Sequence, residues 1–197
     1  MALRTLRVPD LAQSSPARWA AHYDRVYIDL GTGNGAHALH VARSQPGTAV
    51  IGLDTNIDHL TGSRKSRPGN VRFIQHDART FPIGELPVAN QVTINFPYGS
   101  LLRGLIDGDP NLLARLDRLL GPDGRLTVRV NARAFVAGGF DPVRGIDDVV
   151  AGLRRIPSVS VAWSALSQDD VRRFPSEWAG RIGYGKPTRA DLIEVCR

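Results

Sequence analysis

Residues 29–35, which read DLGTGNG, constrain the fold of this chain more than any other part of its sequence. An apolar run at 26–28 precedes them, and a segment typical of a helix follows at 36–42. Glycine permits positive φ angles and lets a ligand approach the main chain closely. An aspartate at a strand end, alternating glycines and then a helix therefore predict a backbone surface for a small cofactor.

A second strand supports this interpretation. Residues 49–54 (AVIGLD) form another apolar run, and it ends in the carboxylate Asp54. That carboxylate lies about twenty residues beyond the glycines, the spacing at which an acidic side chain bonds the ribose hydroxyls of a nucleotide cofactor. A turn that binds nothing is the alternative, and the order and spacing of the glycines and Asp54 argue against it.

Two cofactors fit this pattern, NAD and S-adenosylmethionine. The dinucleotide fingerprint is G-x-G-x-x-G. Here Gly31, Gly33 and Gly35 are spaced G-x-G-x-G, and Asp29 stands two residues upstream. That form is typical of methyltransferases. An NAD-dependent oxidoreductase is disfavoured, because no catalytic Tyr/Lys or His/Asp arrangement accompanies the loop.

Strand-like and helix-like segments alternate along the chain. The strand candidates are 25–30, 48–54, 70–76, 90–95, 125–131, 158–166 and 189–196. The helix candidates are 35–44, 56–65, 100–106, 109–120, 142–155 and 168–175. The alternation predicts an α/β fold, with a mainly parallel sheet and helices on both faces.

We expect residues 1–24 to form an N-terminal extension with a short hairpin or helical turns, and residues 25–197 to form the main domain. Ligands of parallel sheets bind beyond the carboxyl ends of the strands. Asp54, Asp77 and the segment 95–100 follow strand candidates, as the glycine loop does. We therefore expect all of them to converge on one cleft.

Composition limits the class of protein. A chain of 197 residues is long enough for one well-cored domain. No apolar run approaches the ~20 residues that span a bilayer, and charged residues and a proline interrupt the N-terminus where a signal peptide is apolar. We therefore expect a cytoplasmic protein with no membrane contact, and a monomer by default. The single cysteine, Cys196, and five scattered histidines predict no metal site. The net charge of +6 favours a polyanionic partner.

Two aromatic segments suggest contacts with a base. The first, 95–100 (NFPYGS), places Phe96 and Tyr98 beside a proline at a strand end, and bases stack on such platforms at ~1–3 kcal/mol each. The second surrounds Trp178 in a polar, glycine-rich stretch that also holds Arg181 and Lys186. For both segments the alternative is that the rings pack a loop against the domain.

Taken together, these residues resemble the aminoglycoside-resistance 16S rRNA (adenine-1408-N1)-methyltransferases. The resemblance runs from about Tyr23 to the C-terminus and is strongest in 23–33 (YDRVYIDLGTG), 96–104 (FPYGSLLRG) and 176–185 (SEWAGRIGYG). The second and third segments are far more specific to the family than the glycine loop. The resemblance implies a Rossmann-like, seven-stranded class I methyltransferase that methylates N1 of one adenine in the decoding-site helix of the 30S subunit.

The resemblance also implies roles for individual residues. S-adenosylmethionine would be held by a set of loop and strand-end residues: Asp29, Gly31, Gly33, Asp54, Asp77, Ala78, Asn95, Ser100 and Ser176. Tyr98 and Trp178 would sandwich the flipped adenine, with Phe96 in the same platform. The rRNA would be contacted by basic residues: Arg64, Lys65, Arg67, Arg181 and Lys186.

This chain departs from the family pattern at several positions. Tyr98 stands where the family usually has tryptophan, and Asn34 stands where many members have aspartate. The basic linker at 64–69 is shorter than in the family, and Pro187 and Thr188 replace basic residues. These differences bear on affinity for the ribosome and on drug resistance rather than on the core chemistry.

Adenine N1 has an available lone pair and no proton to lose, so we expect no general base. The target base must be flipped out of the rRNA, at a cost of a few kcal/mol. The alternatives are methylation of adenine N6 or guanine N7, and a weakly active or non-catalytic ribosome-binding homologue. Methylation of adenine N6 is an alternative because residues 95–98 (NFPY) partly resemble the N-P-P-Y motif of amino-group methyltransferases.

Overall fold

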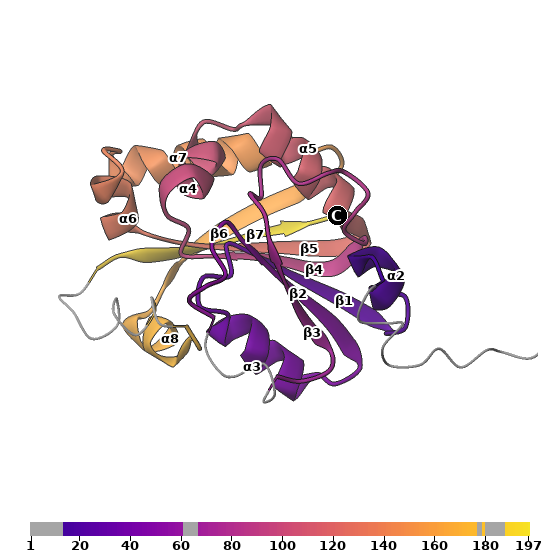
Figure 1. Cartoon of the computed structure of the whole chain (residues 1–197). Helices are drawn as coiled ribbons and strands as arrows, with labels where there is room; N and C mark the ends of the chain where they lie inside the picture. The colour runs from indigo at the N-terminus through magenta and orange to yellow at the C-terminus, as the bar shows by residue number, and fades with distance from the viewer. Residues whose placement is uncertain (1–13, 61–66, 177–178, 180–187) are drawn as a thin grey trace, which may run out of the picture.

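A seven-stranded sheet forms the centre of the molecule (Figure 1). The computed structural model describes residues 14–60, 67–176, 179 and 188–197. The strands are β1 (Arg25–Leu30), β2 (Thr48–Asp54), β3 (Val71–Gln75), β4 (Ala89–Asn95), β5 (Leu120–Asn131), β6 (Ser160–Leu166) and β7 (Ala190–Cys196).

The order of the strands in the sheet is β3-β2-β1-β4-β5-β7-β6. Strands β1 to β5 pair in parallel, and β7 runs antiparallel between β5 and β6. The expected mainly parallel α/β sheet is confirmed.

Helices cover both faces of the sheet (Figure 1). Helices α4, α5, α6 and α7 lie on one side, and α3 and α8 lie on the other. The helix bounds are α2 (Pro16–Ala20), α3 (Ala36–Ser44), α4 (Gly99–Ile106), α5 (Pro110–Leu119), α6 (Ala132–Ala137), α7 (Pro142–Leu153) and α8 (Gln168–Arg173).

The alternation of side chains along β1 divides the core into these two layers. Ile28 and Leu30 pack into the large cluster that includes α4, α5 and α7, whereas Tyr27 packs into the smaller cluster under α3. Successive side chains of a strand point to opposite faces. Because both faces of β1 are covered, β1 and β2 are apolar almost throughout.

Local sequence signals explain where helices α5 and α3 begin. Asp109 caps α5 by accepting a hydrogen bond from the Asn111 backbone N–H at 2.8 Å, and Pro110 occupies the first helical turn. Helix α3 starts after Gly35, whose φ is +76°. A Cβ at Gly35 would lie 2.8 Å from the Phe73 ring, so both the conformation and the space require glycine there.

The structure differs from the sequence prediction in three elements. Residues 56–60 form a turn, in which Asn56 and Asp54 accept backbone hydrogen bonds, so the helix expected at 56–65 is wrong over this part. The rest of that helix lies outside the described residues. Helix α6 was not expected, and β5 begins five residues earlier than the predicted strand at 125–131.

The described part of the expected N-terminal extension packs against the main domain. Trp19 of α2 is buried in the large core cluster. The Arg72 guanidinium of β3 lies 4.6 Å from the Trp19 ring centroid and donates to the Ser14 carbonyl at 2.9 Å. Within the described residues, no helix is both long and apolar enough to cross a bilayer.

Candidate cofactor and base-binding site

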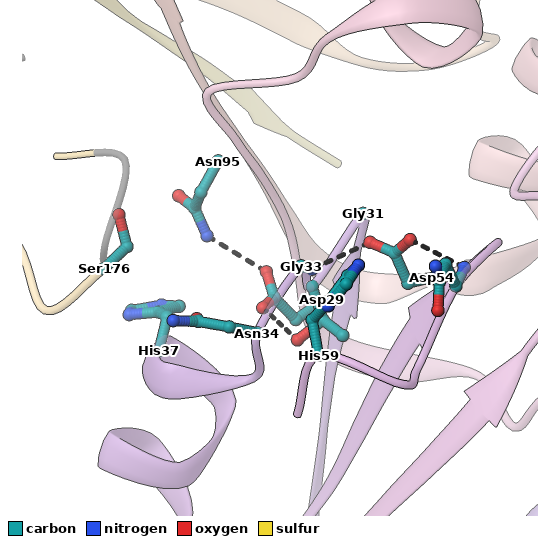
Figure 2. Close-up of a pocket in the computed structure, with 11 residues that line it drawn as sticks. Asp29, Gly31, Gly33, Asn34, His37, Asp54, His59, Asn95 and Ser176 are labelled. Atoms are coloured by element: carbon teal, nitrogen blue, oxygen red, sulfur yellow. Dashed lines mark hydrogen bonds between the residues drawn. The ribbon is translucent and has the colours of Figure 1, made fainter. Parts of the chain in front are cut away.

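Two adjoining cavities lie at the carboxyl ends of the central strands. The first, the loop cavity, has a volume of about 580 Å³ and is shown in Figure 2. The second, the platform cavity, has a volume of about 310 Å³. The residues predicted for the cofactor line one cavity or the other, and four of them line both: Gly31, Gly33, Asp54 and Asn95. The two cavities therefore form one elongated site along the glycine loop.

The glycine loop owes its shape to positive φ angles. Gly31 has φ +73° and Gly33 has φ +55°. The backbone N–H groups of Gly31 and Thr32 donate to the Leu53 carbonyl at 2.8 and 3.0 Å, which ties the loop to β2. A Cβ at Gly31 would lie 2.8 Å from Leu101. The loop thus offers bare backbone to a ligand, as expected.

Asp29 is the centre of a buried hydrogen-bond network. It is 1% exposed and sits at the end of β1. One carboxylate oxygen accepts from Thr93 Oγ1 at 2.8 Å and from Asn95 Nδ2 at 3.0 Å, and the other accepts from Thr32 Oγ1 at 2.8 Å. The contact with Asn95 is visible in Figure 2. Three hydrogen bonds hold the side chain in one orientation, so Asp29 presents a fixed carboxylate to the loop cavity.

The network extends from Asp29 to His37 on α3. Tyr27 Oη donates to Thr93 Oγ1 at 3.1 Å and lies 2.7 Å from His37 Nε2. Because the Thr93 proton is donated to Asp29 and the Tyr27 proton to Thr93, His37 Nε2 must carry the proton that Tyr27 accepts. This hydrogen-bond logic assigns the tautomer. Burial lowers the pKa of His37, which keeps the ring neutral.

Asp54 faces the same loop from the end of β2. Its Oδ2 accepts from the Gly33 backbone N–H at 2.7 Å, and its Oδ1 accepts from the Asn56 backbone N–H at 3.1 Å. These bonds orient the carboxylate at the junction of the two cavities, and Figure 2 shows it beside the glycines. A carboxylate has further lone pairs available, so it can accept from ribose hydroxyls in this position.

The platform cavity holds the remaining predicted cofactor residues, Asp77, Ala78 and Ser100. Asp77 pairs with Arg79 at 2.7 Å, and hydrogen bonds from the Arg79 side chain hold the Asp77 pKa below its usual value. The Asp77 carboxylate is therefore ionised and partly engaged within the protein. On the far side, Ser176 lines the loop cavity and its Oγ accepts from the Ala179 backbone N–H at 3.0 Å.

The two described aromatic residues of the platform lie in different environments. The Tyr98 side chain is 57% exposed at the edge of the platform cavity. Phe96 is 4% exposed, has φ +50°, and packs edge-on against Phe174 with ring centroids 5.6 Å apart. The Tyr98 ring is therefore accessible at the edge of the platform cavity, whereas Phe96 supports this segment from inside.

Several predicted residues lie outside the described part of the chain, namely Trp178, Arg64, Lys65, Arg181 and Lys186. Of the predicted rRNA contacts, Arg67 is described. Its guanidinium lies 5.2 Å from the centroid of Phe73, the ring that packs beneath Gly35. Among the described residues, no group of three acidic, histidine or cysteine side chains is arranged to hold a metal ion.

Sequence reasoning missed three residues that surround Asn95 and Asp29. Arg129 of β5 donates to Asn95 Oδ1 at 2.9 Å. Phe174 stacks on His37 with ring centroids 4.5 Å apart and also lies 4.6 Å from the Arg129 guanidinium. The pairing of β4 with β5 places Arg129 beside Asn95. The only sequence signal was Arg129 between two valines of a core strand, a position at which an arginine calls for a partner.

Known proteins are similar to this chain in sequence and in fold. The chain matches the family NpmA, 16S rRNA (adenine(1408)-N(1))-methyltransferase, over residues 5–196. A 16S rRNA (adenine(1408)-N(1))-methyltransferase of Streptoalloteichus hindustanus is 30% identical over 141 residues, which are 66% of this chain and 63% of that relative. The matched region thus spans less than two thirds of that protein. An Escherichia coli protein of the same name is 24% identical over 93% of this chain and 92% of its own length.

Solved structures of methyltransferases are similar to this chain in fold. The aminoglycoside resistance methyltransferase NpmB1 has a TM-score of 0.66 and 25% identity, over 98% of this chain and 94% of that one. A 16S rRNA (adenine(1408)-N(1))-methyltransferase from Catenulisporales acidiphilia, solved with its cosubstrate SAM, has a TM-score of 0.72 and 20% identity, over 99% and 93%. The class I methyltransferase fold is therefore confirmed. With its match over residues 5–196, this chain belongs to the 16S rRNA (adenine(1408)-N(1))-methyltransferase family.

Proposed function

We propose that this protein transfers a methyl group from S-adenosylmethionine to N1 of adenine 1408 in the 16S rRNA of the 30S subunit. The observation that carries the proposal is the elongated site itself. It begins at the Asp29 carboxylate, passes the glycine loop and Asp54, and ends at the exposed Tyr98 ring. A cofactor bound along the loop would thus lie beside a surface on which a base can stack.

The residues present fit S-adenosylmethionine. The backbone of the loop lines both cavities at Gly31 and Gly33, and a Cβ at Gly33 would project into open space. Asp54 would accept from the ribose hydroxyls, and the fixed carboxylate of Asp29 suits the ammonium group of the methionine end. Ser176 would lie near that end, whereas Ala78 and Ser100 line the opposite cavity. When bound, the cofactor supplies an electrophilic methyl group on a positively charged sulfur.

The protein's own task is then to position the base. Adenine N1 carries its lone pair at neutral pH, so no residue has to remove a proton. Tyr98 would hold one face of the flipped ring, and Trp178 would hold the other. Aromatic faces also stabilise the cationic product ring. Reacting atoms held ~3–3.5 Å apart in line give most of the rate gain in such a transfer.

Asn95 argues against an exocyclic amino group as the target. Enzymes that resemble the N-P-P-Y group use this side-chain oxygen to accept from the amino group. Here Asn95 Oδ1 accepts from Arg129 at 2.9 Å, and Asn95 Nδ2 donates to Asp29 at 3.0 Å. The bonds at both ends fix the amide orientation and occupy one of the two acceptor sites of its oxygen. A target amino group would have to share that oxygen with Arg129, which favours a ring nitrogen as the nucleophile.

The proposed substrate and partner rest on the name of the family that the chain matches. The net charge of +6 suits an rRNA partner, and Arg67, Arg181 and Lys186 are proposed to contact its phosphates with Arg64 and Lys65. We propose that the protein acts in the bacterial cytoplasm as a monomer, without a metal ion. Methylation at this position would confer aminoglycoside resistance, as the name of the NpmB1 methyltransferase indicates for that relative.

Primer extension across the decoding-site helix tests the proposal. Purified 30S subunits are incubated with the protein, with and without S-adenosylmethionine. A methyl group on N1 blocks base pairing, so reverse transcription should stop next to adenine 1408 only when the cofactor is present. Transfer of radiolabelled methyl without such a stop would indicate another acceptor atom. Absence of both signals would refute the activity.

A further inference from the structure

A third cavity adjoins the site on the other side of Phe96. This cavity, the side cavity, has a volume of about 480 Å³, within the range of small-ligand sites. Its floor is a row of register partners across three strands: Arg129 of β5 faces Leu192 of β7, which faces Ser164 of β6. Helix α8 and the residues that follow it form the wall with Arg173 and Phe174.

Arg129 is an unusual residue for such a position. It is partly buried, and among the described residues no carboxylate forms an ion pair with it. One of its five N–H groups has a hydrogen-bond partner in this part of the chain, Asn95 Oδ1. Burial lowers the pKa of Arg129, yet a guanidinium stays charged in proteins. A desolvated cation with donors to spare favours an anionic ligand.

The other groups around the side cavity agree with this chemistry. Arg173 is exposed on α8 and adds a second guanidinium, and Ser164 adds a hydroxyl. One carboxylate, Asp170, also lines the cavity, but it is engaged in the capping box of α8 with Ser167, at 2.6 Å from the hydroxyl. The remaining lining is apolar, with Phe96, Phe174 and Leu192. Two guanidiniums beside apolar walls suit a phosphate that carries a ribose or a base.

We propose that the side cavity binds the nucleotide next to the methylated adenine, with its phosphodiester on Arg129 and Arg173. This inference rests on the proposed function, because the ligand is part of the same RNA strand. The side cavity and the platform cavity share Phe96 as a common wall. Tyr98, on the platform side, lies two residues further along the same segment. An adenine on Tyr98 would thus have its strand neighbour within reach of the side cavity.

Arg129 would link the two sites. The same guanidinium that contacts the phosphodiester donates to Asn95, which in turn donates to Asp29 in the loop cavity. A phosphodiester bound to Arg129 would therefore be connected, through the Asn95 amide, to the Asp29 carboxylate. The residue acts as a positioning residue on the cofactor side and as a phosphate contact on the RNA side.

The salt dependence of 30S binding tests the phosphate contact. The dissociation constant of the Arg173→Ala variant is measured over a series of salt concentrations, with Arg172→Ala as the matched control. Arg172 is the neighbour on α8, pairs with Asp169 at 3.5 Å and does not line the side cavity. Loss of one phosphate contact should reduce the slope of log Kd against the logarithm of the salt concentration by about one. Arg172→Ala should keep the wild-type slope, and both variants should bind S-adenosylmethionine as the wild type does.

A second pair of variants tests the cavity itself without changing charge. Ser164→Trp would fill the side cavity, because Ser164 shares the face of its register partner Leu192, whereas Ala162→Trp lies two residues earlier on the same face of β6 and does not line the cavity. We expect at least about a tenfold loss of 30S affinity for the first variant alone, since a buried interface contact of ~1.4 kcal/mol corresponds to that factor. Equal 30S affinity for both tryptophan variants would overturn the proposal.

A free anion is the competing ligand, and inorganic phosphate is its probe. Phosphate binding by the wild type that disappears in Arg173→Ala, together with an unchanged salt slope for 30S binding, would also overturn the assignment to RNA. These measurements read binding alone, so they are separate from primer extension. If the stop at adenine 1408 fails while the salt slope changes as expected, the proposed reaction is wrong and the RNA subsite stands.

Discussion

A single carboxylate, Asp29, joins the cofactor loop to two strands and to Arg129. Its three hydrogen-bond donors come from the loop itself and from β4, through Thr32, Thr93 and Asn95. Each bond to a charged acceptor contributes about 1.5–3 kcal/mol. The side chain is thus fixed before any ligand arrives, which lowers the entropy lost when a cofactor binds.

Tyr98 is the residue whose replacement should affect methyl transfer most directly among the described residues. Tyr98→Ala removes a stacking surface of about 1–3 kcal/mol, so we expect kcat/KM on 30S subunits to fall about 5- to 200-fold. Affinity for S-adenosylmethionine, measured by calorimetry, should change little. Tyr98→Phe keeps the ring and should keep most of the activity. A large loss of cofactor affinity in Tyr98→Ala would instead place the ring in the cofactor pocket.

His37 should give the folded protein a distinct dependence on pH. Burial lowers the pKa of His37 below its ordinary value of 6.5. As the pH falls below 6.5, the unfolded chain binds a proton at this residue and the folded protein does not. The free energy of unfolding should therefore decrease in this window, by at most about 1.4 kcal/mol per pH unit. Well above pH 6.5, His37 is neutral in both the folded and the unfolded chain, so its titration no longer changes the free energy of unfolding.

Urea denaturation at about pH 7 and about pH 5.5 measures the effect, which falls within the range where histidine titrates. His37→Gln keeps a donor for Tyr27 and does not titrate, so its stability should change less between the two pH values. Asp77 and Asp170 also have lowered pKa values. Their contribution is lost only as the pH falls below the usual carboxylate range, so it does not overlap. Equal pH dependence of the variant and the wild type would contradict the assignment.

At the level of elements, the strands that carry the site could be predicted and the contacts between distant elements could not. The bounds of β1 and β2 agree with the sequence prediction, because an apolar run ends in a turn residue in each case. The turn at 56–60 was mistaken for a helix, since the Asp54 and Asn56 side chains accept from backbone N–H groups two residues further on and compete with helical bonds.

The residues of the site that the sequence did not predict were missed for one common reason. Arg129, Phe174 and His37 meet because β5 pairs with β4 and because α8 lies against the start of α3, on the same side of the sheet. These contacts join residues far apart in the chain, and no local pattern encodes them. Asp29 and Asp54 were found because strand ends of a parallel sheet meet at one edge whatever the details of packing.

Thr93 is the link between β1 and β4 whose loss should weaken the sheet. Thr93→Val keeps the shape and removes the hydroxyl that accepts from Tyr27 and donates to Asp29. Two buried groups then lose a partner, which should lower the free energy of unfolding by about 1–3 kcal/mol in urea denaturation. Thr93→Ser should restore most of it. Thr127→Val is a control, because Thr127 is the register partner on β5 and is also buried. Equal losses for the two valine variants would refute this role.

At the scale of the whole molecule, cofactor binding should raise the stability of the fold. The site is assembled from β1, β2, β4 and the loop residues between them, so the unfolded chain cannot bind the cofactor. A ligand at 100 times its dissociation constant adds about 2.7 kcal/mol. For a domain of this size each kcal/mol corresponds to about 2–4 °C, so S-adenosylmethionine should raise Tm by about 5–11 °C.

The same thermal scan separates the two cofactors that the glycine loop allows. NAD at equal concentration should leave Tm unchanged, because the loop lacks the third glycine spacing of dinucleotide binders. Asp54→Asn keeps an oxygen that can accept from Gly33 and loses the charge and one acceptor for the ribose hydroxyls. Its Tm without ligand should fall somewhat, because its amide nitrogen cannot accept from the Asn56 backbone N–H, and its shift with S-adenosylmethionine, measured from its own unliganded Tm, should be smaller by several degrees. A shift with NAD, or an equal shift for Asp54→Asn, would contradict the cofactor assignment of this loop.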